Sequence, residues 1–484
     1  MPARKRNAKA VVQIGHPTSR AVSRSGRGKG GRLRVRADIA FVALVGSAFV
    51  VAYVIASNPL GNGDAVVPYI VDGQVSVKEW TLDLPFAETV AAAGEAVVLR
   101  HTVVEKWRAR NVWKPSYLSQ KIKQLDGIYE NDNRWFGPYY DIRKPLVNLT
   151  KRVNSYSTNL SMSGVELFRR ILSNESKDFV YFSGEIERLG SWAIDDLLPL
   201  DEFISLNPQS TSINVWIGQP RVIAHCHYDG YHNMYVQLFG KKKFTLFRPS
   251  QWSFIYPYPF LHPSHAQSQV NLSDTDLDRF PQVQKAHAVE AVIGPGDVLY
   301  IPPLWFHYVE ALEASISVNV WTDSAQTLQV QKMYQTPVPL FDGISSEKKD
   351  LQVLALVIII KKLINETHTR KLTNSPETFL SNLYDIRYYN LVVSGVLPRT
   401  GWSHENKSVC SLLQSLMSDL QTVLKDADSL QKYFRYIRTS VELLPTETRE
   451  VWLGNLVESL LESVVTAPFV AQVLSESLEC LHRF

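Results

Sequence analysis

The middle of the chain alternates short hydrophobic runs with turn-forming residues. Each run is four to seven residues long and rich in β-branched and aromatic side chains, and Gly, Pro or Lys turns separate the runs. Runs of this length and composition are typical of strands. They occur at Asn214–Ile217, Tyr235–Phe239, Phe244–Phe247, Val298–Ile301 and Ser315–Trp321. The pattern predicts a small β-barrel or sandwich, and a barrel mouth is a common place for a small ligand.

Helical periodicity replaces this pattern after Asp323. Hydrophobic residues recur at spacings of three and four in Val409–Leu424 and Trp452–Val465, which predicts two amphipathic helices. Leu351–Ile360 is also hydrophobic but is too short to span a membrane. We therefore expect a C-terminal helical region over 326–484. It either packs on the barrel or pairs two copies of the chain.

Segments before the barrel have a mixed pattern. We expect a strand at Ala96–Arg100, a turn at Trp107–Trp113, and the start of a helix at Pro115–Ile122. Val165–Leu172 and Trp192–Leu200 are expected to be helices or helical turns. Within the barrel sequence, Pro249–Val283 is a long aromatic loop. It is expected either to hold substrate over the barrel mouth or to be a packed surface insertion.

A charge-free hydrophobic run of 19 residues, Ile39–Ser57, follows the N-terminal tail. Its length suffices to cross the ~30 Å hydrocarbon core of a bilayer. We expect a transmembrane signal anchor at 39–57 and a stem at 58–75, with a buried soluble helix as the alternative.

Basic residues are concentrated on one side of this run. Residues 1–36 hold 11 of the 51 Lys and Arg and no Asp or Glu, so the rest of the chain, with 40 basic and 47 acidic residues, has a net charge of −7. The tail, 1–38, is too polar to bury a core and is expected to be disordered and cytosolic. Nothing beyond it indicates a nucleic-acid surface.

This orientation predicts a single-pass type II membrane protein with its catalytic domain in the lumen of the endoplasmic reticulum or Golgi. Six Asn-x-Ser/Thr sequons lie after the hydrophobic run. They favour a lumenal location, in which the protein would be a glycoprotein. They begin at Asn148, Asn159, Asn174, Asn271, Asn365 and Asn406. A mitochondrial presequence is the alternative, since the tail bears Arg and Ser and lacks acids.

Three residues in the barrel have the pattern of a metal site. His227 and Asp229 are two positions apart on an extended segment and are expected to face the same way. His307 ends a turn and an apolar strand about eighty residues later and supplies a third ligand. Two imidazoles and one carboxylate on one face of an ion are the ligand set of non-haem Fe(II) oxygenases.

The same alternation predicts that the two residues before His227 point in opposite directions. Cys226 should point away from the metal into the core, and, as one of only three cysteines, it does not imply a disulfide framework. His225 should share the face of His227 and Asp229. It is expected to support the ligands, with direct ligation as the alternative.

Longer motifs carry a resemblance to a known family. The stretch HYDGYHNMYVQLFGKKKF from His227, the stretch GPGDVLYIPPLWFHYVEA around His307, and SISVNVW at Ser315–Trp321 resemble the JmjC (cupin-like) 2-oxoglutarate oxygenases. The hydroxylase branch, typified by the asparaginyl hydroxylase that inhibits hypoxia-inducible factor, is the most similar. The resemblance implies a mixed α+β fold with a double-stranded β-helix (jelly-roll) barrel over 76–325, flanked by helices.

The same resemblance implies further site residues. The residues with which the family binds iron correspond to His227, Asp229 and His307. Those that bind the far carboxylate of 2-oxoglutarate correspond to Lys242 and, by a looser match, to Tyr181. Asn233 corresponds to a co-substrate asparagine, and the late-strand residues Asn319 and Trp321 line the site. Ala224 departs from the pattern, because many relatives carry Thr or Ser there. Losing that hydroxyl would weaken co-substrate binding by ~1 kcal/mol.

The expected function is that of an Fe(II)- and 2-oxoglutarate-dependent dioxygenase that uses O2 to hydroxylate a protein or peptide side chain and releases succinate. The alternatives are an N-methyl-lysine demethylase and a catalytically inactive, membrane-tethered binding module. The resemblance also implies a homodimer through the C-terminal helices.

Overall fold

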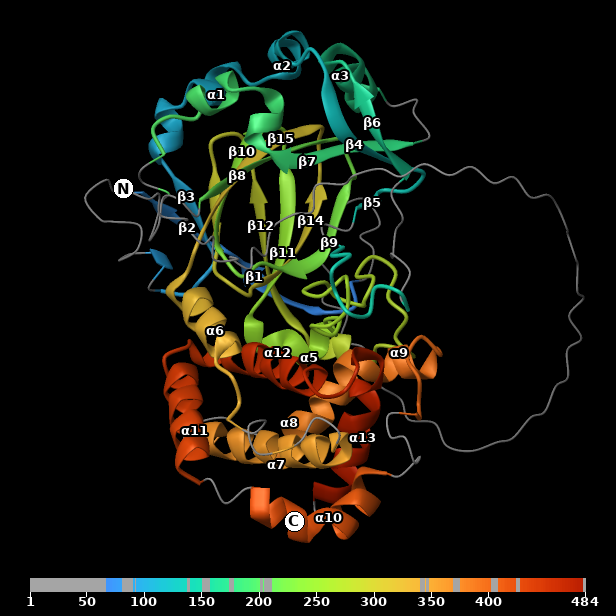
Figure 1. Cartoon of the computed structure of the whole chain (residues 1–484). Coiled ribbons are helices and arrows are strands. Elements are labelled where there is room, and N and C mark those ends of the chain that lie inside the picture. Colours follow the sequence, from blue (N-terminus) through green and yellow to red (C-terminus); the bar gives the residue numbers. More distant parts are fainter. Residues whose placement is uncertain are drawn as a thin grey trace, which may run out of the picture. The chain divides into compact units, whose positions relative to one another are not determined.

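Two β-sheets form the centre of the protein (Figure 1). In this computed structural model the described residues are 67–80, 90–91, 93–136, 140–149, 157–173, 178–200, 203, 211–339, 344, 348–368, 375–401, 408–423 and 427–481. The expected tail and transmembrane run, 1–57, lie outside them. Within the described ranges, no helix combines the length and hydrophobicity needed to cross a membrane.

One sheet has six strands in the order β1-β12-β11-β14-β9-β5. The strands are β1 Ile70–Gln74, β12 His287–Ile293, β11 Lys242–Phe247, β14 Phe306–Ala311, β9 Ile223–Tyr228 and β5 Trp135–Phe136. β1 falls within the range expected to be a stem. It pairs in parallel with β12, so this part of the expected stem belongs to the sheet.

The other sheet has nine strands in the order β2-β3-β13-β10-β15-β8-β7-β4-β6. The strands are β2 Ser76–Glu79, β3 Val97–Arg100, β13 Val298–Ile301, β10 His232–Phe239, β15 Ser315–Thr322, β8 Ser212–Gly218, β7 Phe179–Glu185, β4 Leu125–Asn131 and β6 Ser157–Met162. Side chains from both sheets, among them Trp216, Tyr235, Phe244 and Leu246, form a shared core. The mixed α+β, jelly-roll-like architecture expected from the sequence is confirmed at this level.

Helices cover the outer face of the nine-stranded sheet. They are α1 Arg108–Val112, α2 Pro115–Lys121, α3 Gly164–Leu172 and α4 Trp192–Asp195. Buried side chains in these helices and beside them, including Trp107, Trp113 and Phe168, pack against strand residues in a second core. One expectation is corrected here. Part of the expected turn at Trp107–Trp113 is the helix α1, whose Ala109 amide donates a hydrogen bond to the carbonyl oxygen of Asp196. In the expected helix or helical turns at Trp192–Leu200, the helix ends at Asp195 and turns follow at Asp196 and Leu197.

The C-terminal region is helical, as the periodicity predicts. Its helices are α6 Ala325–Gln335, α7 Lys349–His368, α8 Pro376–Leu383, α9 Tyr389–Val393, α10 Val409–Val423, α11 Ala427–Glu442, α12 Arg449–Glu462 and α13 Val470–Leu481, with a π-helical turn at Tyr384–Tyr388. α7 contains Leu351–Ile360 and is 20 residues long. It lies at the centre of the group, with α8, α10, α11 and α12 in contact with it (Figure 1).

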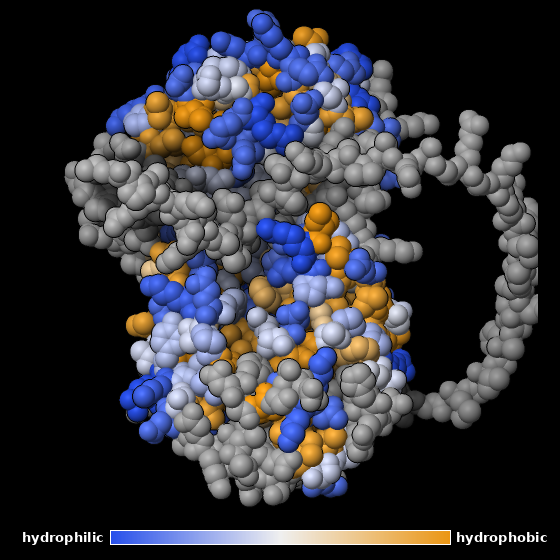
Figure 2. All heavy atoms as spheres, in the orientation of Figure 1, coloured by the Kyte–Doolittle hydropathy of each residue, from blue (hydrophilic) through white to orange (hydrophobic). Residues whose placement is uncertain are grey.

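The hydrophobic residues of these helices pack against one another within the chain. Leu354, Ile364, Leu413, Ile437 and Leu456 are almost completely buried in one cluster. On the face in Figure 2, hydrophilic and hydrophobic residues are interspersed over the helical region. The C-terminal helices thus form a bundle that is packed within the chain, which is one of the two expectations. The homodimer stays a prediction.

The long aromatic loop joins the barrel to the helical region. It contains α5, Trp252–Ile255, which lies beside α12 (Figure 1). The Trp252 indole donates a 2.8 Å hydrogen bond to Glu450, and the amide of Phe260 donates a 2.6 Å bond to Glu458, both on α12. These contacts agree with the packed insertion expected for 249–283, and substrate binding by this loop stays a prediction.

Candidate metal and co-substrate site

The three predicted metal ligands lie together at one end of the six-stranded sheet. His227 on β9 and His307 on β14 are directly paired across the two strands, with ring centroids 4.1 Å apart. Asp229 follows β9 immediately, and its Oδ2 is 3.5 Å from Nε2 of His307. One potential ligand atom from each residue lies within 4.8 Å of the others. The donor set and its spacing fit a single ion held on one face.

Backbone carbonyls fix which imidazole nitrogen faces this point. Nδ1 of His227 is 2.7 Å from the carbonyl oxygen of His225, and Nδ1 of His307 is 3.1 Å from that of Trp305. A carbonyl only accepts, so each Nδ1 carries the proton and donates it. The unprotonated Nε2 of each ring is left as the ligand atom, an arrangement typical of metal-binding histidines.

Strand β9 contains a bulge just before these ligands. His307 pairs with His227, but Val309, two residues further on, pairs with Ala224, three residues further back. Two residues of β9 therefore lie opposite one residue of β14. Side chains normally alternate between the two faces of a strand, and a bulge adds one residue to that sequence. Across the bulge, residues an odd number of positions apart can therefore lie on the same face.

The bulge determines where the neighbours of the ligands point. Ala224 lines the cavity, although it is an odd number of residues from His227. His225 faces away, and its Nε2 is 2.8 Å from the carbonyl oxygen of Ser268. The prediction that the His225 side chain shares the ligands' face is wrong for this reason. Burial lowers the pKa of His225, and only its carbonyl supports His227. Cys226 is free and buried away from the cavity, as predicted.

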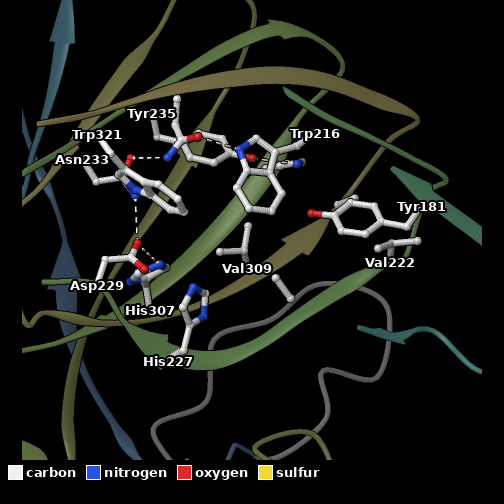
Figure 3. Close-up of a pocket in the computed structure, with 14 residues that line it drawn as sticks. Tyr181, Trp216, Val222, His227, Asp229, Asn233, Tyr235, His307, Val309 and Trp321 are labelled. Carbon is white, nitrogen blue, oxygen red and sulfur yellow. Dashed lines mark hydrogen bonds and ion pairs between the residues drawn. The ribbon is translucent and has the colours of Figure 1, made fainter. Parts of the chain in front are cut away.

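A cavity between the two sheets is lined by the three ligands (Figure 3). All five residues that the resemblance assigns to the co-substrate line it. They are Tyr181, Asn233, Lys242, Asn319 and Trp321. Val222, Ala224, Val309 and Ala311 form an apolar wall. The structure thus brings the predicted residues together from six strands, without testing the role of each.

Lys242 carries a cationic group into this cavity. Its side chain is 3% exposed, and Nζ donates to the phenol oxygen of Tyr235 at 2.7 Å and to Oγ of Ser317 at 3.0 Å. In the described part of the chain no carboxylate forms an ion pair with Lys242. Burial accordingly lowers its pKa to about 7. A buried ammonium held only by hydroxyls favours binding of an anion beside it.

Sequence motifs did not mark three further polar or aromatic residues of the site. Trp216 and Tyr235 line the cavity, and Tyr235 and Ser317 accept hydrogen bonds from Lys242. Period-two alternation could have found Tyr235 from Asn233 and Ser317 from Asn319, because each pair is two residues apart on one strand. Trp216 shows no comparable local signal.

Comparison with known proteins identifies the family. A family model of the cupin-like domain matches residues 83–327, about half of the chain. The chain belongs to this cupin-like family. Its expected place among the JmjC, cupin-like proteins is confirmed, since Jumonji C domain-containing protein 5 of Drosophila melanogaster is 32% identical over 114 residues, 24% of this chain and 28% of that protein.

Other relatives have different names. HSPB1-associated protein 1 of Homo sapiens is 28% identical over 251 residues, which make up 51% of this chain and 46% of the relative. Lysine-specific demethylase JMJ30 of Arabidopsis thaliana is 34% identical over 110 residues, 23% of this chain and 25% of the relative. The matches thus span about half of the first relative and a quarter of the second.

Proposed function

We propose that this chain is an Fe(II)- and 2-oxoglutarate-dependent dioxygenase that hydroxylates a side chain of a protein or peptide. The observation that carries the proposal is one cavity with two complementary parts. His227, Asp229 and His307 offer the facial ligand set for Fe(II), and Lys242 lies buried in the same cavity without a carboxylate partner among the described residues.

Bound Fe(II) would supply the oxidative chemistry, in which O2 converts 2-oxoglutarate to succinate and carbon dioxide and hydroxylates a C–H group. The chain's own residues position the reactants. Lys242, with Tyr235 and Ser317, would hold the far carboxylate by charge-assisted hydrogen bonds. Tyr181 points its hydroxyl into the cavity (Figure 3) and would add a hydrogen bond from an uncharged donor.

The apolar wall of the cavity would separate the two polar ends of 2-oxoglutarate. Val309 and Ala311 lie on the same face of β14 as His307, and Val222 and Ala224 lie on β9 or next to it. These side chains offer no hydrogen bonds to the middle of the co-substrate and exclude water from it. Trp321 and Asn319 complete the opposite wall on β15.

An N-methyl-lysine demethylase is the second candidate. The support is that relatives such as JMJ30 are named lysine-specific demethylases. Demethylation of this type begins with hydroxylation of the methyl group, so it makes the same demands on the metal and co-substrate residues. The reading as an inactive binding module finds no support in the site, because all three ligand side chains are present and converge.

The association with HSPB1 in the name of one relative agrees with a protein as partner or substrate. For the compartment, we propose a single-pass type II protein with a lumenal catalytic domain, the mitochondrion being the alternative. Cys410 is disulfide-bonded, and disulfides persist in oxidising compartments such as the lumen.

The test is incubation of the full chain with Fe(II), ascorbate and labelled 2-oxoglutarate, with candidate peptides added or omitted. We expect labelled succinate, and peptide that has gained one oxygen; loss of a methylene unit from methylated peptide would select the demethylase instead. His307→Ala is the control and should give neither product. Succinate no greater than in His307→Ala would refute the proposal.

A further inference from the structure

A chain of three hydrogen bonds ends on the carboxylate of Asp229. The indole Nε1 of Trp216 donates to Oδ1 of Asn319 at 2.9 Å. Nδ2 of Asn319 donates to Oδ1 of Asn233 at 3.1 Å. Nδ2 of Asn233 in turn donates to Oδ2 of Asp229 at 3.3 Å. Figure 3 shows these bonds crossing the cavity wall from Trp216 towards the metal ligands.

The chain has only one possible direction. An indole N–H donates and cannot accept, so the atom of Asn319 that faces Trp216 must be its oxygen. The amide nitrogen of Asn319 then faces Asn233 and requires an oxygen there. This leaves the amide nitrogen of Asn233 towards Asp229. Reversal of either amide would set an amide oxygen against another acceptor.

The backbone positions these residues for that sequence of bonds. Trp216, Asn319 and Asn233 lie on β8, β15 and β10, which are neighbours in the nine-stranded sheet. Asn319 pairs with Tyr235, so it is diagonal to Asn233. Ser317 pairs with Trp216, so Asn319 is diagonal to Trp216 as well. Diagonal neighbours on one sheet face are within side-chain reach.

Burial makes this order costly to break. Asn319 is 0% exposed, Asn233 3% and Trp216 7%. Water cannot readily replace a lost partner at such positions, and a buried amide without its partner costs about 1–3 kcal/mol. An amide turned the wrong way at either asparagine would therefore be strongly disfavoured while Trp216 keeps its N–H.

We propose that Trp216 is a positioning residue for the metal centre, acting through the two asparagines to fix the orientation of the Asp229 carboxylate. The inference rests on the proposed function in taking Asp229 as a metal ligand. Without the indole N–H, Asn319 and then Asn233 are free to turn, and Asn233 can present its oxygen to the carboxylate. The metal site would then form less often, although every ligand is present.

The test measures metal binding without turnover. The full chain is titrated with Mn(II) and with Co(II), in the absence of 2-oxoglutarate, by calorimetry and by the visible spectrum of bound Co(II). Trp216→Phe keeps a ring in the wall and removes only the donor. We expect about tenfold weaker binding of both ions, in the range for residues that orient metal ligands, together with a changed Co(II) spectrum.

Trp113→Phe is the matched control. Trp113 is also buried, and its indole donates a bond of the same 2.9 Å length, to Asp196 outside the cavity. Its loss should lower the melting temperature and leave the affinity for Mn(II) and Co(II) unchanged. Equal weakening in Trp113→Phe and Trp216→Phe would overturn the inference, because the effect would then be one of general stability.

A double-mutant cycle tests the route. In an Asn233→Leu background the last link is already broken, so adding Trp216→Phe should weaken metal binding no further. Asn319→Leu breaks the middle link and should weaken metal binding as much as Trp216→Phe does. It replaces Trp216→Phe in the test if that variant does not fold. Full additivity would overturn the inference. Failure of the unmodified chain to bind either ion would instead refute the proposed function itself.

Discussion

The ammonium of Lys242 on β11 lies 2.7 Å from the phenol oxygen of Tyr235, which is on the preceding strand, β10, in the other sheet. The two side chains meet across the interior of the barrel, and Ser317 joins them from β15. This cluster connects the sheets at the opposite end of the cavity from the predicted metal ligands. In the proposed function, this cluster would bind the far carboxylate of 2-oxoglutarate, whose near end would reach the metal.

Removal of the charge at this cluster should weaken 2-oxoglutarate binding strongly. A charge-assisted hydrogen bond contributes about 1.5–3 kcal/mol, roughly 10- to 150-fold in affinity. Lys242 adds a positive charge on the donor, whereas the Tyr181 donor is uncharged. We expect Lys242→Met to raise the dissociation constant within that range and Tyr181→Phe to raise it less, as measured by calorimetry with Mn(II) present. Lys241→Met is the control, because Lys241 is exposed and pairs with Glu313. Equal effects of Lys242→Met and Lys241→Met would contradict the assignment.

Binding of 2-oxoglutarate should also take up a proton above pH 7. Burial lowers the pKa of Lys242 from 10.5 to about 7, and a carboxylate beside the amine favours its charged form and raises that pKa. The apparent affinity should therefore fall as the pH rises above 7. Calorimetry in buffers of different ionisation enthalpy measures the uptake, which Lys242→Met should abolish. Binding without proton uptake at these pH values would be evidence that Lys242 is already charged.

The same pKa predicts a pH dependence of folding stability. Because the folded-state pKa is lowered, the unfolded chain holds the Lys242 proton more strongly between pH 7 and 10.5. In this interval the contribution of Lys242 to the free energy of unfolding rises with pH. Below pH 7 the full cost of burying the ammonium remains. Denaturant unfolding of the unmodified chain and of Lys242→Met should therefore give stabilities that converge as the pH is raised; curves that stay parallel would contradict this.

His225 and His227 should respond differently to the same substitution. His225→Ala removes a side-chain bond to Ser268 on the outer side of β9 and keeps the carbonyl that orients His227. We expect it to lower the free energy of unfolding by about 1–3 kcal/mol and to retain the bound metal. His227→Ala should lose the metal. Metal content after dialysis checks this, and loss as complete in His225→Ala as in His227→Ala would mean that the ligands are wrongly assigned.

The topology proposal predicts an intact N-terminus, membrane association that resists carbonate, and a mobility shift after endoglycosidase treatment. Asn148 and Asn365 are exposed and are the expected glycan sites in the described residues. Asn271 is less suited, because it is partly buried and its Oδ1 accepts a bond from the Ser273 amide. Protease protection of the tail instead of the barrel in sealed microsomes would reverse the orientation. Import into mitochondria with loss of the tail would change the compartment.

The sequence predicted the positions of the three metal ligands from local motifs, and the family resemblance added Lys242. The strands that carry them have continuous hydrophobic patterns, and the turn before His307 is marked by Gly and Pro. The orientation of the His225 side chain could not be predicted from the sequence. Alternation predicts one face for His225 and His227, and only the pairing of β9 with β14 shows the extra residue between Ala224 and His227.

Long-range contacts explain the other differences. Trp216 reaches Asn319 across 103 positions of sequence, so its role depends on which strands are neighbours. α7 extends to twice the length of its hydrophobic run because surrounding helices bury Leu363 and Ile364 beyond Lys361 and Lys362. Neither the strand order nor this helix packing can be read from local periodicity.

The central claim is that Fe(II) and 2-oxoglutarate occupy one cavity, held by His227, Asp229 and His307 at one end and by Lys242 at the other. Anaerobic titration of the full chain, followed by visible absorption, tests it most directly, since a charge-transfer band requires the keto acid to be bound to the iron. We predict a band only when both are added, absent in Asp229→Ala and requiring more 2-oxoglutarate in Lys242→Met. A band of equal strength in Asp229→Ala, or none in the unmodified chain, would contradict the account.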